Sequence, residues 1–343
     1  MSNTLVAANP RKEARTAAWV AGIACAALIF DGFDLTIYGT VLTTLMADPS
    51  HIGALDAATA GTLGSYALIG VLIGALICGS IGDYVGRRRI ILVGIAWFSI
   101  GMFVTSLSTS IFAFGALRLI TGIGLGAILA TAGATIAEFA PAGRRNFYNA
   151  VVYSGIPAGG VLAALLGMIL LEPLGWRGLF MIGATPILFL LPIAFFKLPE
   201  SPRWLLSRGR REEAEALSLK TGTPLLEEVV VQKAGATPAK TGFGAVFSSQ
   251  FRVGAILLGF MSFSGLLLTY GLNTWLPRIM ESYGFNATYS LTFLLLLNTG
   301  PIIGGLVIAA LAGPTATAAT AFYVFAGVAV FGALVCALVP KHD

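Results

Sequence analysis

Residues 17–46 read AAWVAGIACAALIFDGFDLTIYGTVLTTLM, an apolar run whose only charged residues are Asp31 and Asp34. A helix that crosses a bilayer needs about 20 mostly apolar residues, so this run is long enough to span. Basic residues precede it, and a short apolar core behind basic residues is also typical of a secretory signal peptide. Because the run continues past both aspartates without a persuasive cleavage site, we predict an uncleaved first membrane span.

The composition of the whole chain agrees with this first segment. Of the 343 residues, 57% are hydrophobic and 11% are charged, and the mean hydropathy is +0.86. Soluble domains carry about 25% charged residues. The composition therefore excludes a disordered chain, a nucleic-acid binder that is basic throughout and a disulfide-rich secreted domain. The three cysteines lie inside apolar runs, without the spacing of a metal or redox site.

Further apolar windows predict a polytopic, all-α membrane protein. Nine windows are long enough to span: 17–46, 60–81, 90–108, 111–137, 147–171, 177–197, 253–276, 289–311 and 319–339. Small residues in them, as in Gly70-x3-Gly74 and the run from Gly122 to Gly126, predict close helix packing.

The distribution of Lys and Arg predicts an orientation. If the N-terminus is cytoplasmic, the inside segments hold 17 basic residues and the outside segments hold two, Arg177 and Arg278. The long polar break then lies inside, and it divides the chain into three predicted parts. These are a six-span bundle (1–198), a cytoplasmic loop (199–250) and a shortened bundle of about three spans (251–343).

The two intramembrane acids are the strongest functional signal. Asp31 and Asp34 are three residues apart, so both lie on about the same side of a helix. A carboxylate in the hydrocarbon core costs about 2.5–3.5 kcal/mol even on the lenient insertion scale, and such acids usually mark proton relays or substrate paths. We predict a role in proton coupling, against the alternative of buried polar anchors.

Arg118 is the natural counter-charge. At 1.5 Å per residue, Arg118 lies about 10 Å from the outer surface, and Asp34 lies about 24 Å from the inner one. In a core of about 30 Å these depths are similar. The spacing allows an ion pair, or an Arg118 that binds a substrate carboxylate.

A second group of charges lies between predicted spans. The sequence from Gly79 to Arg89, GSIGDYVGRRR, holds Asp83, Gly86, Arg87 and Arg88. Glu138, Arg144 and Arg145 repeat the pattern of an acid followed by arginines after the fourth window. The glycines permit a tight turn, and the charges predict a latch that forms in one conformation and breaks in another.

These motifs resemble the major facilitator superfamily and, more narrowly, its aromatic acid:proton symporters. The narrower resemblance is carried by the sequence DGFD at residues 31–34, with support from residues 118–126, 198–205 and 270–277. It implies uptake of benzoate-like or hydroxybenzoate-like anions together with protons. It also implies that Asp31, Asp34, Asp83 and Arg118 matter for transport.

Other residues are softer candidates. Tyr66, Tyr153, Tyr270 and Asn298 lie in predicted spans and could line a cavity, although each also suits an interhelical or interfacial role. No catalytic, metal-binding or phosphate-binding motif is found in the sequence, so we expect neither an enzyme nor a bound cofactor.

The resemblance implies twelve spans, three more than the windows provide. Residues 304–318, where the second half should repeat the latch motif, contain no acid or arginine. We therefore expect an internal deletion of about three spans and an impaired carrier unless the chain oligomerises. Two other functions remain open: a non-transporting sensor or scaffold of the same fold, and a proton-linked drug antiporter. An arginine in the cavity argues against the cationic substrates of such an antiporter.

Overall fold

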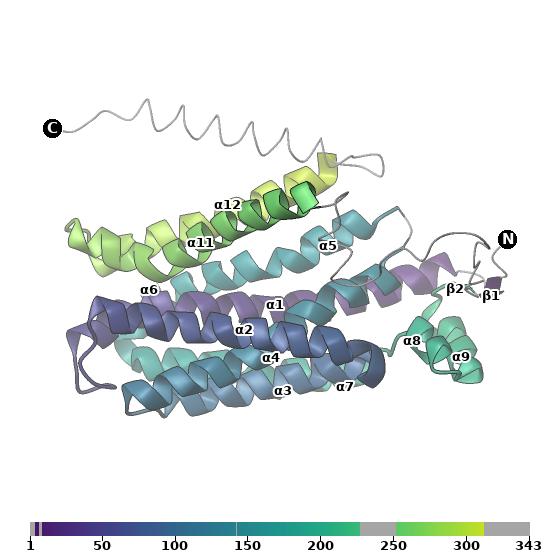
Figure 1. Ribbon diagram of the computed structural model, residues 1–343, viewed down its shortest axis with the longest axis horizontal. Coiled ribbons are helices and arrows are strands. Elements are labelled where there is room, and N and C mark those ends of the chain that lie inside the picture. Colours follow the sequence, from purple (N-terminus) through teal and green to yellow (C-terminus); the bar gives the residue numbers. More distant parts are fainter. Residues whose placement is uncertain (1–3, 7–8, 142, 227–251, 312–343) are drawn as a thin grey trace.

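The computed structural model is a bundle of long helices that run along one axis (Figure 1). It describes residues 4–6, 9–141, 143–226 and 252–311. The first half contains α1 (Pro10–Ala47), α2 (Ala57–Val85), α3 (Arg87–Ser106), α4 (Ile111–Phe139), α5 (Arg145–Tyr153), α6 (Gly155–Ala184) and α7 (Pro186–Lys197). The short helices α8 (Pro202–Ser207) and α9 (Arg211–Thr221) follow, and then α11 (Arg252–Ser282) and α12 (Ala287–Leu311).

Polar side chains cap the first turns of two of the long helices, α2 and α4. The Asp56 side chain accepts a hydrogen bond from the Thr59 amide at 2.8 Å and caps α2, and Ser110 caps α4 in the same way through Ala113 at 3.2 Å. Such caps satisfy backbone N–H groups that have no partner inside the helix. The predicted windows therefore become helices with short polar connections.

Within the described residues, seven helical stretches are long and apolar enough to cross a membrane. One of them, residues 145–197, contains two of the predicted windows. A straight helix of this length would measure about 80 Å, far more than the hydrocarbon core. Gly175 interrupts it with φ 63° and ψ 178°.

The chain reverses its direction at Gly175. Just after it, the Arg177 guanidinium donates to the Ser108 carbonyl at 3.1 Å, in the loop between α3 and α4. At the far end of the stretch, the Leu198 carbonyl accepts from Arg88 Nε at 2.7 Å, at the opposite end of α3. Windows 147–171 and 177–197 are therefore two separate segments that run in opposite directions, and their crossing of the membrane stays a prediction.

Glycines bring the helices into backbone contact. A Cβ added to Gly70 or Gly74 in α2 would collide with the carbonyl oxygen of Leu119 or Ile123 in α4. The close packing predicted for these glycines is confirmed. Gly32 of α1 and Gly159 of α6 meet the backbone of the partner helix in the same way.

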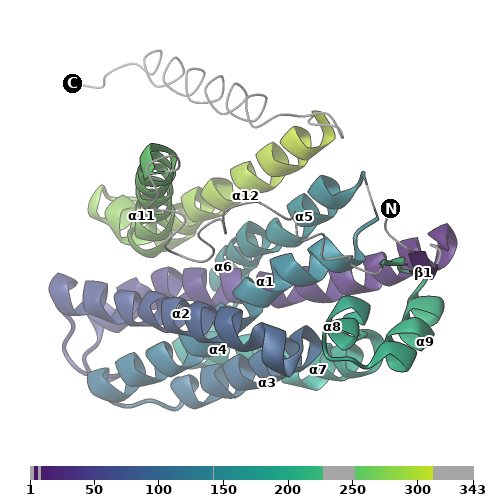
Figure 2. The same cartoon turned by 45° about the vertical axis from the view of Figure 1, so that its right-hand side comes forward.

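The second half lies along one side of the first. α11 packs against α1, and α12 packs against α6 (Figures 1 and 2). At the end where the chain starts, β1 (Thr4–Val6) and β2 (Leu225–Leu226) form a short antiparallel pair beside α9, which the sequence did not predict. The predicted window 319–339 and residues 227–250 of the predicted loop lie outside the described residues.

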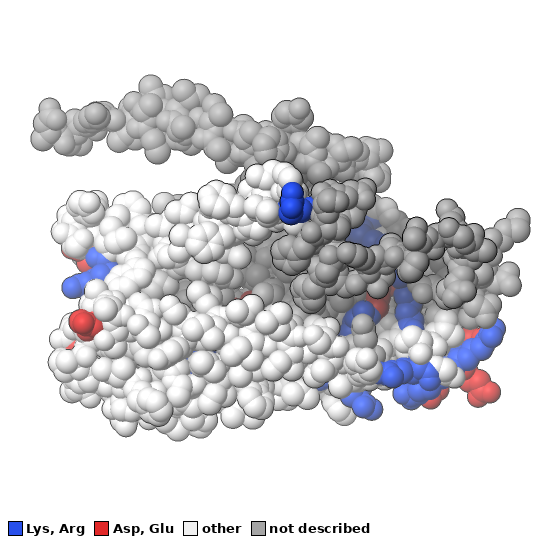
Figure 3. Space-filling view, viewed as in Figure 1, with Lys and Arg blue, Asp and Glu red and all other residues white. Residues whose placement is uncertain are grey.

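The surface has the polarity of a membrane protein. Apolar side chains such as Leu72, Ile193 and Phe196 are exposed on the flanks of the bundle. Figure 3 shows a broad uncharged flank, with Lys and Arg gathered at the end that carries α8 and α9. The predicted all-α membrane bundle is confirmed.

Candidate functional site

A buried ion pair joins α1 to α4 near the middle of the bundle. Arg118 Nη1 lies 2.6 Å from Asp34 Oδ1 and also donates to the Asp34 carbonyl oxygen at 3.1 Å. Both side chains are almost completely buried, at 2% and 1% exposed. The contact that their depths allow is thus present in the structure, while its role in transport stays a prediction.

Aromatic rings surround the Arg118 guanidinium. Its Cζ lies 5.2 Å from the centre of the Tyr38 ring and 6.0 Å from that of Phe180. The Tyr38 hydroxyl donates to the Ala60 carbonyl oxygen at 2.6 Å, which fixes the ring between α1 and α2. The faces of aromatic rings attract cations, so the rings help to hold this charge in an apolar interior.

Asp31 lies one turn before Asp34 and is equally buried. Its Oδ1 atom finds no hydrogen-bond donor in the described part of the chain, and neither does Asp34 Oδ2. Arg118 Nε, in turn, finds no acceptor there. Buried polar atoms are nearly always paired. The two unpaired carboxylate oxygens could therefore bind a proton, and the unpaired N–H group of Arg118 could donate a hydrogen bond to a further acceptor atom.

A polar cluster from the second half meets α1 close to these acids. Asn298 Nδ2 of α12 donates to Asn273 Oδ1 of α11 at 2.7 Å, and Thr36 Oγ1 of α1 donates to the same oxygen at 3.3 Å. Tyr270, one turn before Asn273, is close enough to Asp31 to interact with it electrostatically. The cluster connects both halves of the chain at the level of the carboxylates.

The other two tyrosine candidates lie elsewhere. Tyr66 is 36% exposed and its ring covers Gly115, and Tyr153 is 39% exposed with its hydroxyl beside Gly133. Neither joins the cluster around Asp31. Each lies against a glycine of the neighbouring helix α4, which fits the interhelical role that the sequence left open.

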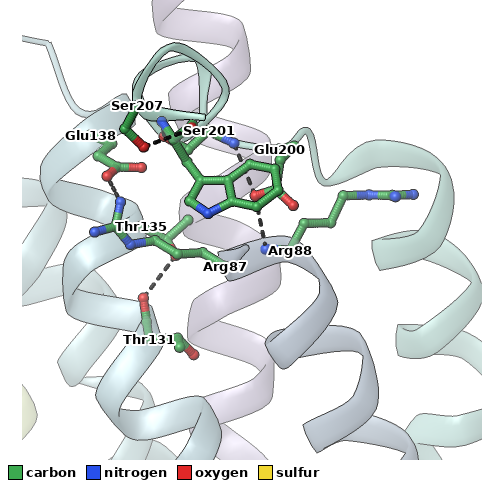
Figure 4. Close-up of polar contacts among 9 residues, drawn as sticks. Arg87, Arg88, Thr131, Thr135, Glu138, Glu200, Ser201 and Ser207 are labelled. Atoms are coloured by element: carbon green, nitrogen blue, oxygen red, sulfur yellow. Dashed lines mark hydrogen bonds and ion pairs between the residues drawn. The ribbon is translucent and has the colours of Figure 1, made fainter. Parts of the chain in front are cut away.

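Two of the residues predicted to form a latch are in contact between α3 and α4, while their action as a latch stays a prediction. Arg87, the first residue of α3, forms an ion pair with Glu138 near the end of α4 (Figure 4). Arg88 extends the other way and donates to the carbonyl oxygens of Phe195 and Leu198 at 2.6 and 2.7 Å. These bonds connect the start of α3 to α4 on one side and to the end of α7 on the other.

Glu200 completes this network, and sequence reasoning did not select it. Its Oε1 atom accepts from the Arg88 amide at 3.2 Å and from the Ser201 amide at 3.1 Å (Figure 4). Gly86, at φ 94°, allows the turn between α2 and α3, and a Cβ there would lie 2.6 Å from Glu200 Oε2. Glu200 could have been found from the sequence, because it lies in residues 198–205, one of the stretches that carry the family resemblance.

Three of the remaining latch residues, Gly79, Arg144 and Arg145, are not joined to this network in the described part of the chain. Gly79 lies inside α2 with no heavy atom within 4 Å of an added Cβ, so the tight turn that the glycines permit is formed at Gly86 and not at Gly79. Arg144 and Arg145 are exposed and form no ion pair with the described residues. The side chain of Asp83, in the last turn of α2, is outside the described part of the structure.

Comparison with known sequences places this architecture in a family. The sequence profile of the Major Facilitator Superfamily matches residues 24–342. The chain belongs to the major facilitator superfamily. Among superfamily members, it is 33% identical to the benzoate transport protein of Acinetobacter baylyi over 81% of this chain and 61% of that protein. It is also 33% identical to the gentisate transporter of Corynebacterium glutamicum, over 82% of this chain and 58% of that protein.

The chain spans about three fifths of the length of these superfamily relatives. Among solved structures it is similar to the proton:xylose symporter XylE, with a TM-score of 0.64 over 88% of this chain and 70% of that one. The sequences are only 20% identical, so this similarity shows the superfamily fold alone.

Proposed function

We propose that this superfamily member is a proton-coupled symporter that carries aromatic carboxylates such as benzoate or a hydroxybenzoate. The observation that carries the proposal is the buried Arg118–Asp34 pair, with the second acid, Asp31, one turn away. The names of the relatives, which include benzoate, gentisate and 4-hydroxybenzoate transporters, support this substrate class.

In the proposed mechanism the substrate carboxylate competes with Asp34 for Arg118. The guanidinium presents several N–H donors in one plane and suits a carboxylate. When the substrate anion takes this place, Asp34 loses its counter-charge and binds a proton. One negative charge and one proton then cross together, because a neutral Asp34 and a paired Arg118 leave no uncompensated charge in the core.

Asp31 provides a second proton site. Its unpaired oxygen lies in α1, five residues before Thr36, which contacts Asn273 of the polar cluster, and Asp31 interacts electrostatically with Tyr270 of α11. Rearrangement of Asn273 and Tyr270 against α1 would change the surroundings of Asp31 as the halves move. Protonation of Asp31 would thereby favour one of the two conformations.

The topology in the proposal has a cytoplasmic N-terminus and a multi-pass chain in the cell membrane. Its domains are the bundle 1–198, the loop 199–250 and the shorter bundle 251–343. Support comes from the basic residues, since Arg88, Arg210 and Lys220 line the same cavity as Lys12 and Arg15 near the start of the chain. Helices α8 and α9 lie at the end of the bundle that holds the N-terminus (Figure 1), and Lys and Arg gather at that end (Figure 3).

Uptake of radiolabelled benzoate into proteoliposomes tests the proposal. With the outside medium acidic, we expect accumulation above equilibrium that a protonophore abolishes. Asp31→Asn should lower this gradient-driven accumulation, because it removes one of the two proton sites, and should keep benzoate exchange between the two sides. Asp56→Asn is the matched control, because it also removes one carboxylate, but at an exposed helix cap that asparagine can replace.

Three results would contradict the proposal. Uptake that survives the double change Asp31→Asn and Asp34→Asn would exclude these acids from coupling. Benzoate binding without accumulation would favour a sensor or scaffold. Proton-driven export of a hydrophobic cation would favour a drug antiporter.

A further inference from the structure

A cavity of about 1020 Å³ lies at the end of the bundle that carries the N-terminus. The first turns of α1 and α3, the end of α7, and helices α8 and α9 enclose it. Seven basic and two acidic side chains line it. The proposed function uses neither the cavity nor most of these charges.

Part of this charge is already balanced within the protein. Arg210 donates to Glu213 through Nε and Nη2, at 2.7 and 2.5 Å. Arg88 is held by backbone carbonyl oxygens. Four basic side chains of the lining form no ion pair with the described residues: Arg15, Arg89, Lys197 and Lys220. The cavity therefore carries an excess of positive charge for which an anion is the natural partner.

One side of the cavity is apolar and continues onto the flank of the bundle. Trp19 is 42% exposed and Phe196 is 80% exposed, and both belong to the lining. Lys197 Nζ lies 5.4 Å from the centre of the Trp19 ring, so cation and aromatic groups are adjacent there. Exposed aromatic rings beside basic residues are typical of the membrane–water interface.

We propose that this cavity binds the headgroup of an anionic phospholipid. The phosphate would lie among Arg15, Arg89 and Lys197, and the acyl chains would pass over Phe196 onto the apolar flank. Basic pockets between membrane helices bind anionic headgroups in this manner. The apolar, exposed side favours a lipid over a free phosphate ion, which would gain nothing from these rings.

Native mass spectrometry of the purified full chain tests the proposal. We expect phosphatidylglycerol to remain bound under conditions that remove phosphatidylcholine. The triple variant Arg15→Gln, Arg89→Gln, Lys197→Gln should bind phosphatidylglycerol about a hundredfold more weakly, because each basic residue near an anionic surface contributes roughly a fivefold factor. A variant with Arg15→Lys, Arg89→Lys and Lys197→Arg keeps the charges and should keep the binding.

The matched control removes three exposed basic residues from outside the lining, Arg11→Gln, Arg203→Gln and Arg252→Gln. It should bind phosphatidylglycerol as well as the unmodified chain, and circular dichroism should show equal helicity for all variants. Equal weakening in the control would show general attraction to charge and overturn the site. Displacement of the lipid by millimolar inorganic phosphate or glycerol phosphate would identify a free-anion site and overturn the lipid assignment.

Discussion

The Arg118–Asp34 pair is asymmetric at the level of single residues. An arginine cannot lose its proton inside a protein, whereas a carboxylate can become neutral by gaining one. Arg118 is 2% exposed and has the Asp34 carboxylate as its charged partner. Removal of Asp34 therefore leaves a side chain that must stay charged, whereas removal of Arg118 leaves one that can become neutral.

This asymmetry predicts unequal effects of two substitutions. Asp34→Asn leaves a permanent buried cation, and we expect the free energy of unfolding to fall by about 3–5 kcal/mol. Arg118→Met leaves a carboxyl that can take up a proton, and we expect a smaller loss of about 1–2 kcal/mol. Denaturation in mild detergent measures both, and the double variant should recover most of the loss. Equal losses would show that Arg118 finds another counter-charge.

At the scale of elements, the contact between α1 and α6 explains why residue 32, between the two aspartates, is a glycine. The backbone of α6 at Ile156 lies where the Cβ of any other residue would be. Residues 31–34 therefore have two roles: Asp31 and Asp34 provide the two carboxylates, and Gly32 allows the backbones of α1 and α6 to pack in contact.

Gly32→Ala should force these helices apart and lower the free energy of unfolding by about 1–3 kcal/mol. The matched control is Gly22→Ala in the same helix, where an added Cβ meets nothing within 4 Å. Because alanine favours a helix over glycine, the control should be neutral or stabilising by up to about 1 kcal/mol. Thermal unfolding of both variants in one detergent compares them, and a control as unstable as Gly32→Ala would refute the steric explanation.

The contact between α3 and α4 gives a second test at this scale. Arg87 and Glu138 are 22% and 11% exposed, so solvent screens their interaction only in part. A double-mutant cycle with Arg87→Gln and Glu138→Gln should give a coupling energy of about 1 kcal/mol. Arg145→Gln combined with Glu138→Gln should be additive at physiological salt. A coupling energy between Glu138 and Arg145, with none between Glu138 and Arg87, would show that Arg145 and not Arg87 is the partner of Glu138.

Much of the element level was predictable from the sequence, because the length of an apolar run is a local property. Eight of the nine windows correspond to described helices, and the reversal at Gly175 lies between two of them. The role of Gly79 was not predictable, since spacing alone does not tell which glycine forms the turn. Contacts of Glu200 and Asn273 depend on segments more than 100 residues away, which no local pattern reveals.

At the scale of the whole molecule, two polar ends enclose an apolar flank. The loop 48–56 and Arg177 lie at one end, and α8, α9 and the cavity lie at the other (Figure 1). The Lys and Arg distribution predicts that the second end is cytoplasmic. Both ends are accessible to reagents through exposed side chains, which makes the orientation measurable.

Cysteine labelling in intact cells tests this orientation. The three native cysteines are first changed to serine. A cysteine at Ala54, exposed in the loop before α2, should react with a membrane-impermeant maleimide added outside. A cysteine at Leu219, 62% exposed in α9, should react only after the membrane is permeabilised. The opposite pattern would reverse the topology and place the basic cavity on the outer leaflet. Labelling of both sites in intact cells would show a mixed orientation, which 17 basic residues on one side and two on the other should prevent.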